Sequence, residues 1–380
     1  MPSPRNSPQV RPPSAPDCQI NRARQWWLPW RRSLLPLAAA GLSLALLPTA
    51  AHAGLARIMT VSGSVQLRRE AWSEFRPANP GTALYGPDLL EPGRGSRILV
   101  ICPNGSRWIV PAGTISAVNN GCPGTPRALK PQFGIGDLRG GSDPAIPYVI
   151  APRLDTVLSP TPPLRWNPVE GAETYRVSLQ TRRGALWEIE TDQTAIPYPN
   201  DQPTLAPGTL YTLVVETESG AISTDDPTEL RFNLLTGDRA EAAQTDIAAV
   251  EAMDLPDMVA TLILVEDVYP RYELTGTAIE ALEGLVAAGC ETAKVRRLLG
   301  DLYLKSGLRL LAEQNYEAAL ALALATDNLE EQVLAQYGLG TLYARVGEPE
   351  QAVEYLEAAQ AGALALGDTT LADDIAAELL

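Results

Sequence analysis

The chain has 380 residues, of which 45% are hydrophobic and 20% are charged. This length and composition are typical of a globular protein with room for about three domains. The formal net charge of −15 opposes binding to phosphate backbones, so we expect no nucleic-acid partner. The single histidine, His52, leaves little scope for histidine-based catalysis or histidine-rich metal sites.

Residues 1–53 resemble an export signal. An apolar run at 34–47 precedes a small-x-small cleavage pattern at 51–53, and the run is too short to favour a membrane span. The segment 31–35 is similar to a twin-arginine signal, although an ordinary secretory leader also carries arginine there. An uncleaved anchor is the third alternative, and only then do we expect contact with a membrane. We predict an exported protein of the periplasm or cell envelope.

Residues 54–128 alternate in the manner of β-strands. Apolar runs at 97–102 and 106–110 flank a Pro-Asn-Gly turn at 103–105, where asparagine and glycine tolerate positive φ. The glycine and hydrophobic positions of this segment resemble FecR-like domains, which are small all-β modules of the bacterial periplasm. In the FecR family a cytoplasmic segment regulates a sigma factor. The proline-rich start of this chain lacks helical periodicity, which puts that signalling role in doubt.

Two of the four cysteines, Cys102 and Cys122, fall in this predicted domain. An oxidising compartment would favour a disulfide between them, which would contribute about 3 kcal/mol. Two separate thiols are the alternative, because pairing cannot be read from a sequence.

Residues 152–235 form a second predicted β-domain, after a glycine-rich linker at 129–151. The segment resembles a fibronectin type III or related immunoglobulin-like sandwich, with Trp166 as the buried ring of the core. The run 205–211 matches the later corner of that family, where the hydroxyl of a tyrosine, here Tyr211, ties a loop to the backbone. This resemblance implies a fold and no particular activity.

Residues 237–380 carry recurring helical units. In the last unit one helix at 334–345 is followed by a turn at 347–349 and a second helix at 350–366. Its residues fall where the tetratricopeptide repeat (TPR) family places small and large packing side chains, and small side chains let helices approach closely. The residues that carry this resemblance are Leu339, Gly340 and Tyr343, with Leu299, Gly300 and Tyr303 in a middle unit and Val265 in a weaker first unit.

The predicted fold class is therefore multidomain β plus α. It comprises an N-terminal all-β FecR-like module, a β-sandwich and a C-terminal α-helical TPR solenoid. An unrelated antiparallel helical bundle is the alternative for the C-terminal part.

The TPR resemblance implies a peptide-binding concave face formed by the first helix of each pair. The corresponding positions are Lys294, Arg297, Asp301 and Lys305 in the middle unit, Leu334, Tyr337, Thr341 and Arg345 in the last, and Ile263, Asp267 and Arg271 in the first. Lys294, Arg297, Lys305 and Arg345, with Arg309 as a further candidate, would form a basic strip. We hypothesise that this strip binds an acidic peptide or a terminal carboxylate. The alternative is a solvated helix face.

No catalytic constellation, metal cluster or cofactor motif assembles in the sequence, so we expect no enzymatic activity and no cofactor. The resulting hypothesis is a non-enzymatic adaptor of the cell envelope that binds a protein partner. One alternative is a carbohydrate-binding protein in which Trp72, Trp108 or Trp187 stacks on sugars, and another is a FecR-like regulator. Because the repeats are few, we also expect self-association through the terminal helices.

Overall fold

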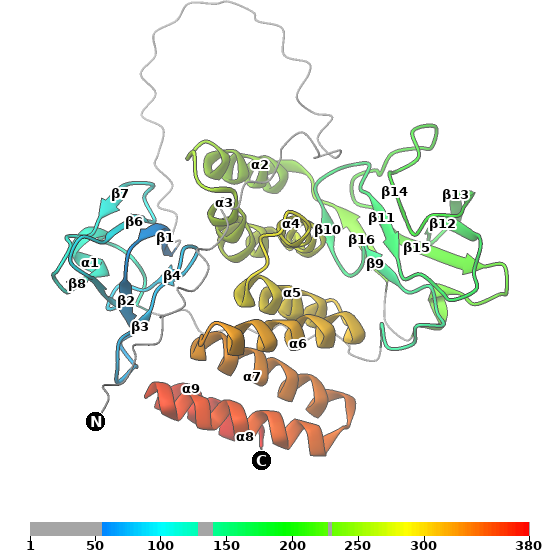
Figure 1. Ribbon diagram of the computed structural model, residues 1–380. Coiled ribbons are helices and arrows are strands. Elements are labelled where there is room, and N and C mark those ends of the chain that lie inside the picture. Colours follow the sequence, from blue (N-terminus) through cyan, green and yellow to red (C-terminus); the bar gives the residue numbers. More distant parts are fainter. Residues whose placement is uncertain (1–54, 128–139, 227–229, 380) are drawn as a thin grey trace, which may run out of the picture.

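The computed structural model describes residues 55–127, 140–226 and 230–379. Several β-sheets come first in the chain and stacked helices follow, so the broad β-then-α architecture predicted from the sequence is confirmed. Figure 1 shows a column of helices, from α2 (Gly237–Glu251) to α9 (Thr369–Glu378), with one β-region on each side. The predicted leader at 1–53 lies outside the described residues. Among the helices that are described, none combines the length and apolarity that a bilayer crossing requires.

The first β-region consists of two four-stranded antiparallel sheets, with strand orders β4-β1-β6-β7 and β3-β2-β5-β8. Their strands are β1 (Ala56–Ser62), β2 (Val65–Arg68), β3 (Arg76–Pro77), β4 (Ala83–Leu84), β5 (Leu89–Pro92), β6 (Arg97–Ile101), β7 (Arg107–Ile109) and β8 (Ser116–Ala117). The predicted turn at 103–105 joins β6 to β7, and Gly105 adopts the positive φ of 79° that the turn requires. Ile58, Leu67 and Leu90 are fully or almost fully buried between the sheets.

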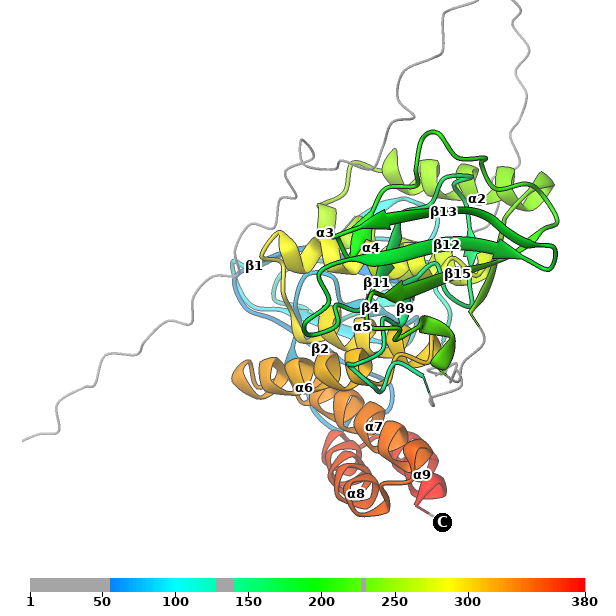
Figure 2. The same cartoon turned by 90° about the vertical axis from the view of Figure 1, so that its right-hand side faces the viewer.

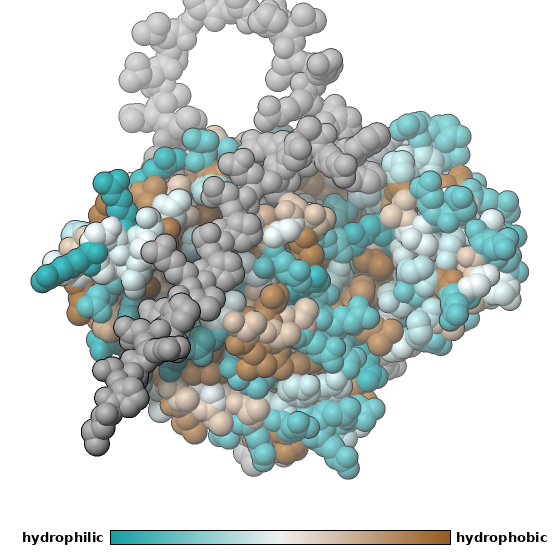
Figure 3. Space-filling model, in the orientation of Figure 1, coloured by the Kyte–Doolittle hydropathy of each residue, from teal (hydrophilic) through white to brown (hydrophobic). Residues whose placement is uncertain are grey.

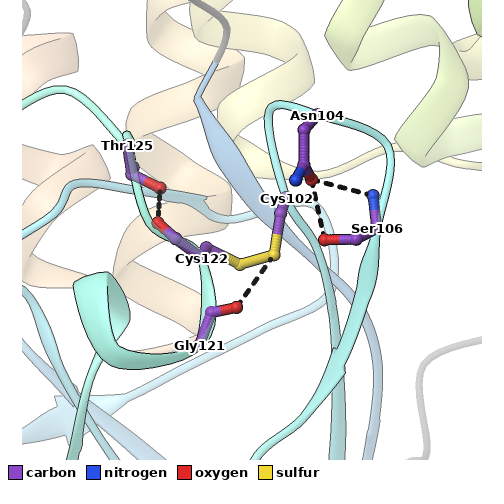
Figure 4. Close-up of a disulfide and its surroundings, with 6 residues drawn as sticks. All are labelled: Cys102, Asn104, Ser106, Gly121, Cys122 and Thr125. Carbon is purple, nitrogen blue, oxygen red and sulfur yellow. Dashed lines mark hydrogen bonds between the residues drawn. A yellow bond between two sulfur atoms is a disulfide. The ribbon is translucent and has the colours of Figure 1, made fainter.

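The disulfide predicted as one alternative is present between Cys102, after β6, and Cys122, after the short helix α1 (Val118–Gly121) (Figure 4). The two Cα atoms are 5.1 Å apart, and both side chains are buried. Asn104 Oδ1 accepts hydrogen bonds from the backbone nitrogen and hydroxyl of Ser106, which stabilises the adjacent turn. A disulfide of this kind persists in an oxidising compartment.

The second β-region pairs a five-stranded sheet, ordered β10-β16-β15-β12-β13, with a three-stranded sheet, ordered β14-β11-β9. The strands are β9 (Val149–Ala151), β10 (Thr156–Val157), β11 (Leu164–Trp166), β12 (Tyr175–Thr181), β13 (Gly184–Thr191), β14 (Ala195–Ile196), β15 (Leu210–Thr217) and β16 (Arg231–Leu234). Trp166 is 1% exposed in the core, as expected. The hydroxyl of Tyr211 accepts a 2.7 Å hydrogen bond from the backbone nitrogen of Ala206, so the predicted tie to the loop is present.

The helices after the second β-region pack in sequence order. Between α2 and α9 lie α3 (Asp257–Ile263), a π-helical turn η4 (Leu264–Val268), a 3-10 turn η5 (Tyr269–Tyr272), α4 (Thr275–Ala287), α5 (Ala293–Lys305), α6 (Arg309–Ala325), α7 (Leu329–Val346) and α8 (Pro349–Leu366). The turn predicted at 347–349 ends α7, and Gly347 has the left-handed conformation that favours glycine at a helix end. Helix α7 begins before the predicted position 334.

Glycines on one helix face large side chains on the next. A Cβ atom on Gly300 of α5 or Gly338 of α7 would lie 2.6 Å or 2.4 Å from the buried ring of Tyr316 on α6. A Cβ atom on Gly340 would lie 2.6 Å from Leu356 Cγ and 3.1 Å from its backbone nitrogen, on α8. Close contact at Gly300 and Gly340 is thus what the sequence predicts.

The close contact at Gly340 can be tested by adding one methyl group. We expect Gly340→Ala to lower the free energy of unfolding by about 1 kcal/mol, because overpacking costs about 1–3 kcal/mol and exceeds the gain of about 1 kcal/mol in helix propensity. Urea unfolding followed by far-UV circular dichroism measures the change. The matched control is Gly284→Ala on α4, where no heavy atom lies within 4 Å of the added Cβ, and this variant should gain stability. A gain in both variants would contradict the contact.

Candidate functional site

Three of the residues predicted to bind a partner lie in a network of ion pairs on the helices. Lys294 Nζ is 3.0 Å from Glu266 Oε1 of η4. Arg297 Nε is 2.6 Å from Glu331 Oε2 of α7, and Arg297 Nη1 is 2.5 Å from Asp301 Oδ2. Both cations have largely buried side chains, and the carboxylates that they contact belong to the same chain.

Two further predicted residues, Tyr337 and Thr341 of α7, bind the last helix of the chain. Their hydroxyl groups donate to Oε1 and Oε2 of Glu378 on α9, at 2.9 Å and 2.8 Å. Burial and the neighbouring Glu378 raise the pKa of Tyr337, so its hydroxyl stays protonated and remains a donor. These two side chains therefore contact a carboxylate of the same chain.

Two more of the predicted residues, Lys305 and Arg345, are separated from this network. Lys305 and Arg345 lie in the last turns of α5 and α7, and both side chains are exposed. The structure thus divides the predicted site into an internal group and an exposed pair, and the lysines and arginines do not form one continuous exposed strip.

Arg57 of β1 completes the internal network from the first β-region. Its side chain is fully buried, and its Nη1 lies 2.6 Å from Glu266 Oε2 while its Nη2 lies 3.6 Å from Asp267 Oδ2. Burial alone would raise the pKa of Glu266, but the positive charges of Arg57 and Lys294 lower that pKa to about 2. Glu266 therefore links β1 to α5. Sequence reasoning missed Arg57, because a single arginine in an alternating strand is typical of a solvated face.

Arg69 makes a second charged link between the first β-region and the helices. Its guanidinium carbon lies 5.4 Å and 4.9 Å from the ring centroids of Trp72 and Tyr85. Its Nη1 is 2.7 Å from Asp88 Oδ2, and its Nη2 is 2.8 Å from Glu330 Oε1 of α7. Apolar side chains of this β-region share a buried cluster with α7, α8 and α9, so the contact is both ionic and hydrophobic.

The second β-region is held to the opposite side of the column by its own polar contacts. The carboxylate of Asp155 accepts hydrogen bonds from the backbone nitrogens of Thr275 and Gly276 at 2.8 Å and 2.6 Å, at the start of α4. Burial raises the pKa of Asp155 to about 7, although these hydrogen bonds act to lower it. Arg165 of β11 forms a two-point ion pair with Glu283 of α4.

Two of the three tryptophans proposed as sugar platforms have their rings packed inside the protein. Trp72 is 7% exposed and Trp187 is 5% exposed. The indole nitrogen of Trp187 donates to the hydroxyl of Tyr198 at 3.0 Å. Trp108 is half-buried, and its ring occupies the space beside Gly121. In this conformation neither Trp72 nor Trp187 offers an open ring face like the one that sugar stacking requires.

Comparison with known proteins assigns no family to the chain. No protein-family model matches the chain, and no curated protein matches it. The FecR-like, fibronectin-like and TPR-like resemblances therefore stay predictions. Within the described residues, histidine, cysteine, aspartate and glutamate side chains form no group of three that could hold a metal ion.

The buried pair at Arg57 predicts a large loss of stability on truncation. Arg57→Met would leave Glu266 and Asp267 without their main cation, and removing one partner of a buried ion pair costs about 3–5 kcal/mol. The matched control is Arg176→Met, because Arg176 is half-exposed and its 3.2 Å pair with Glu216 lies on the surface. That variant should lose less than about 1 kcal/mol. Urea unfolding measures the free energy of unfolding of both variants. Equal losses of stability in the two variants would contradict the role of Arg57.

The lowered pKa of Glu266 predicts a defined pH dependence. Its folded-state pKa of about 2 lies below the ordinary value of 4.5, so the ion pair stabilises the fold above pH 4.5 and loses this effect as the pH falls toward 2. We expect Glu266→Gln to be less stable than the wild type by about 2–3 kcal/mol at pH 7. The difference should shrink between pH 4.5 and 2.

The control for this titration is Glu357→Gln, at an exposed position of α8. Its difference from the wild type should stay small across the same pH range. A Glu266→Gln difference that does not change with pH would rule out the proposed linkage.

Proposed function

We propose that this protein is a non-enzymatic scaffold of the bacterial cell envelope, exported to the periplasm or the cell surface. The observation that carries the proposal is the helical column itself, which binds a β-region on each side through ion pairs, hydrogen bonds and shared apolar clusters. The Cys102–Cys122 disulfide and the predicted export leader support an oxidising location.

We further propose that the first β-region is FecR-like, that the second is fibronectin type III-like and that the helices are TPR-like. The hydrogen bond from Ala206 to the hydroxyl of Tyr211 supports the second of these assignments. The contacts of Gly300 with Tyr316 and of Gly340 with Leu356 support the third. Each of these folds occurs in proteins with many different activities. The proposed function is therefore argued from exposed surface residues and not from the fold.

The proposed partner is a protein or peptide that presents carboxylates to Lys305 and Arg345. Lys294 and Arg297 already bind Glu266, Glu331 and Asp301, so a partner at those positions would have to displace contacts within the chain. The two exposed cations need no such displacement. Charge-assisted hydrogen bonds to a carboxylate are strong enough to orient a peptide there.

Site-specific photo-crosslinking of the full-length protein in its own cell envelope tests this proposal. A photoreactive amino acid at position 305 should crosslink a discrete protein, and one at position 345 should crosslink the same protein. Adding Arg345→Glu to the position-305 form should lower the yield by about ten-fold, because a repulsive charge replaces an attractive one.

The matched control places the photoreactive group at the exposed position Glu170, on the second β-region. That form should give no such product. Equal products from positions 170 and 305, or a yield that Arg345→Glu leaves unchanged, would overturn the proposal.

A further inference from the structure

Strand β13 is an open edge of the five-stranded sheet. It has eight residues and lies at the end of the strand order, where it pairs with β12. Within the described parts of the chain, no other segment forms a backbone ladder with it. Figure 2 shows β13 along the margin of the sheet, and Figure 1 places it at the end of the molecule away from the helical column. An edge strand of this length is a template for a further strand.

A β-bulge gives this edge an exposed apolar centre. The register with β12 shifts between Leu179 and Gln180, so that Leu186 is an extra residue beside Trp187. Trp187 points into the core and is 5% exposed, whereas Leu186 is 45% exposed. Hydrophilic residues cover much of the outer end of this region in the view of Figure 3.

The charges around β13 are separated by sign. Arg182 and Arg183 form the turn before the strand, while Glu188 and Glu190 lie in its second half and Asp192 follows it, and all five residues are exposed. Charged residues on an edge usually oppose pairing with another strand. With this separation, a second copy aligned in parallel is repelled, whereas an antiparallel copy meets opposite charges at both ends.

We propose that β13 is a homodimer interface, in which two copies pair antiparallel and join their five-stranded sheets into one continuous sheet. Arg182 and Asp192 are equally distant from Trp187 along the chain. A two-fold pairing centred at Trp187 therefore brings Arg182 and Arg183 of each copy beside Asp192 and Glu190 of the other. Such an interface is isologous, so each favourable contact occurs twice. In this register Leu186 of each copy lies opposite Glu188 of the other, next to the two-fold axis.

This interface does not involve the terminal helices, through which the sequence predicts self-association. Helix α9 instead packs on α8 and binds α7 through Glu378. The β13 interface also leaves Lys305 and Arg345 exposed, so the dimer and the proposed partner can be tested separately.

Sedimentation velocity over a range of protein concentrations tests the proposal. The wild type should show a reversible monomer–dimer equilibrium. Arg182→Glu with Arg183→Glu makes both ends of the edge negative, and Glu190→Arg with Asp192→Arg makes both ends positive. Each variant alone should dimerise with a Kd at least about ten-fold weaker, because like charges then lie opposite each other across the strands. A mixture of the two variants should form a heterodimer, with a Kd within about three-fold of the wild-type value.

The matched control is Arg94→Glu with Arg97→Glu, which makes the same change of charge at exposed positions in the first β-region. This control should dimerise like the wild type. The proposal is overturned if the wild type stays monomeric at every concentration, if the dimer tolerates the β13 variants, or if their mixture does not associate. Circular dichroism of each variant verifies that the fold is unchanged.

Discussion

The structure depends on one partly buried carboxylate, that of Glu266, which is held between two cations. Taking a carboxylate out of water costs several kcal/mol, and only close positive charges with good geometry offset that cost. Here one cation, Arg57, comes from the first strand of the first β-region, and the other, Lys294, comes from α5. The helices therefore satisfy their internal charges only while the first β-region is docked. The two regions form one cooperative unit as a consequence, although they lie far apart in the sequence.

On the other side of the column, the helices depend in the same way on a polar group from the second β-region. The start of α4 leaves backbone donors free, and Asp155 from the second β-region accepts hydrogen bonds from two of them. Domains joined by small polar contacts usually move relative to one another. Here ion pairs and hydrogen bonds are combined with shared apolar clusters, which favours fixed relative positions of the three regions. A fixed arrangement suits a scaffold, since surface groups on different regions then lie at constant separations.

The features that the sequence predicts correctly are local. The turn at 103–105, the tie at Tyr211 and the contacts at Gly300 and Gly340 each follow from a few neighbouring residues with a definite conformational requirement. Pairing of Cys102 with Cys122 needed the structure, because spacing leaves it open. The role of Arg57 could not have been predicted from its neighbours in the sequence. Its partner Glu266 is 209 positions away, and nothing near Arg57 marks it as buried.

The contacts of the candidate-site residues could not be predicted from the sequence either. Lys294 and Arg297 lie on α5, Tyr337 and Thr341 lie on α7, and each of the four contacts a carboxylate of the same chain. The sequence pattern describes each helical unit alone, so it carries no information on which other segment contacts these four side chains. Glu331, Glu378 and Glu266 supply those carboxylates from within the chain, and only tertiary packing decides this.

The ion pairs inside the molecule also determine the charge of its exposed surface. The chain carries a net charge of −15, and several of its arginines and lysines are buried against carboxylates inside the molecule. These ion pairs neutralise charge internally, so the exposed surface carries the acidic excess and an approaching acidic partner is repelled over most of it. Attraction is confined to places where cations remain exposed, such as Lys305, Arg345 and the turn at Arg182 and Arg183. A general negative field with a few local positive groups favours specific contacts over non-specific ones, because an incorrect approach meets like charge.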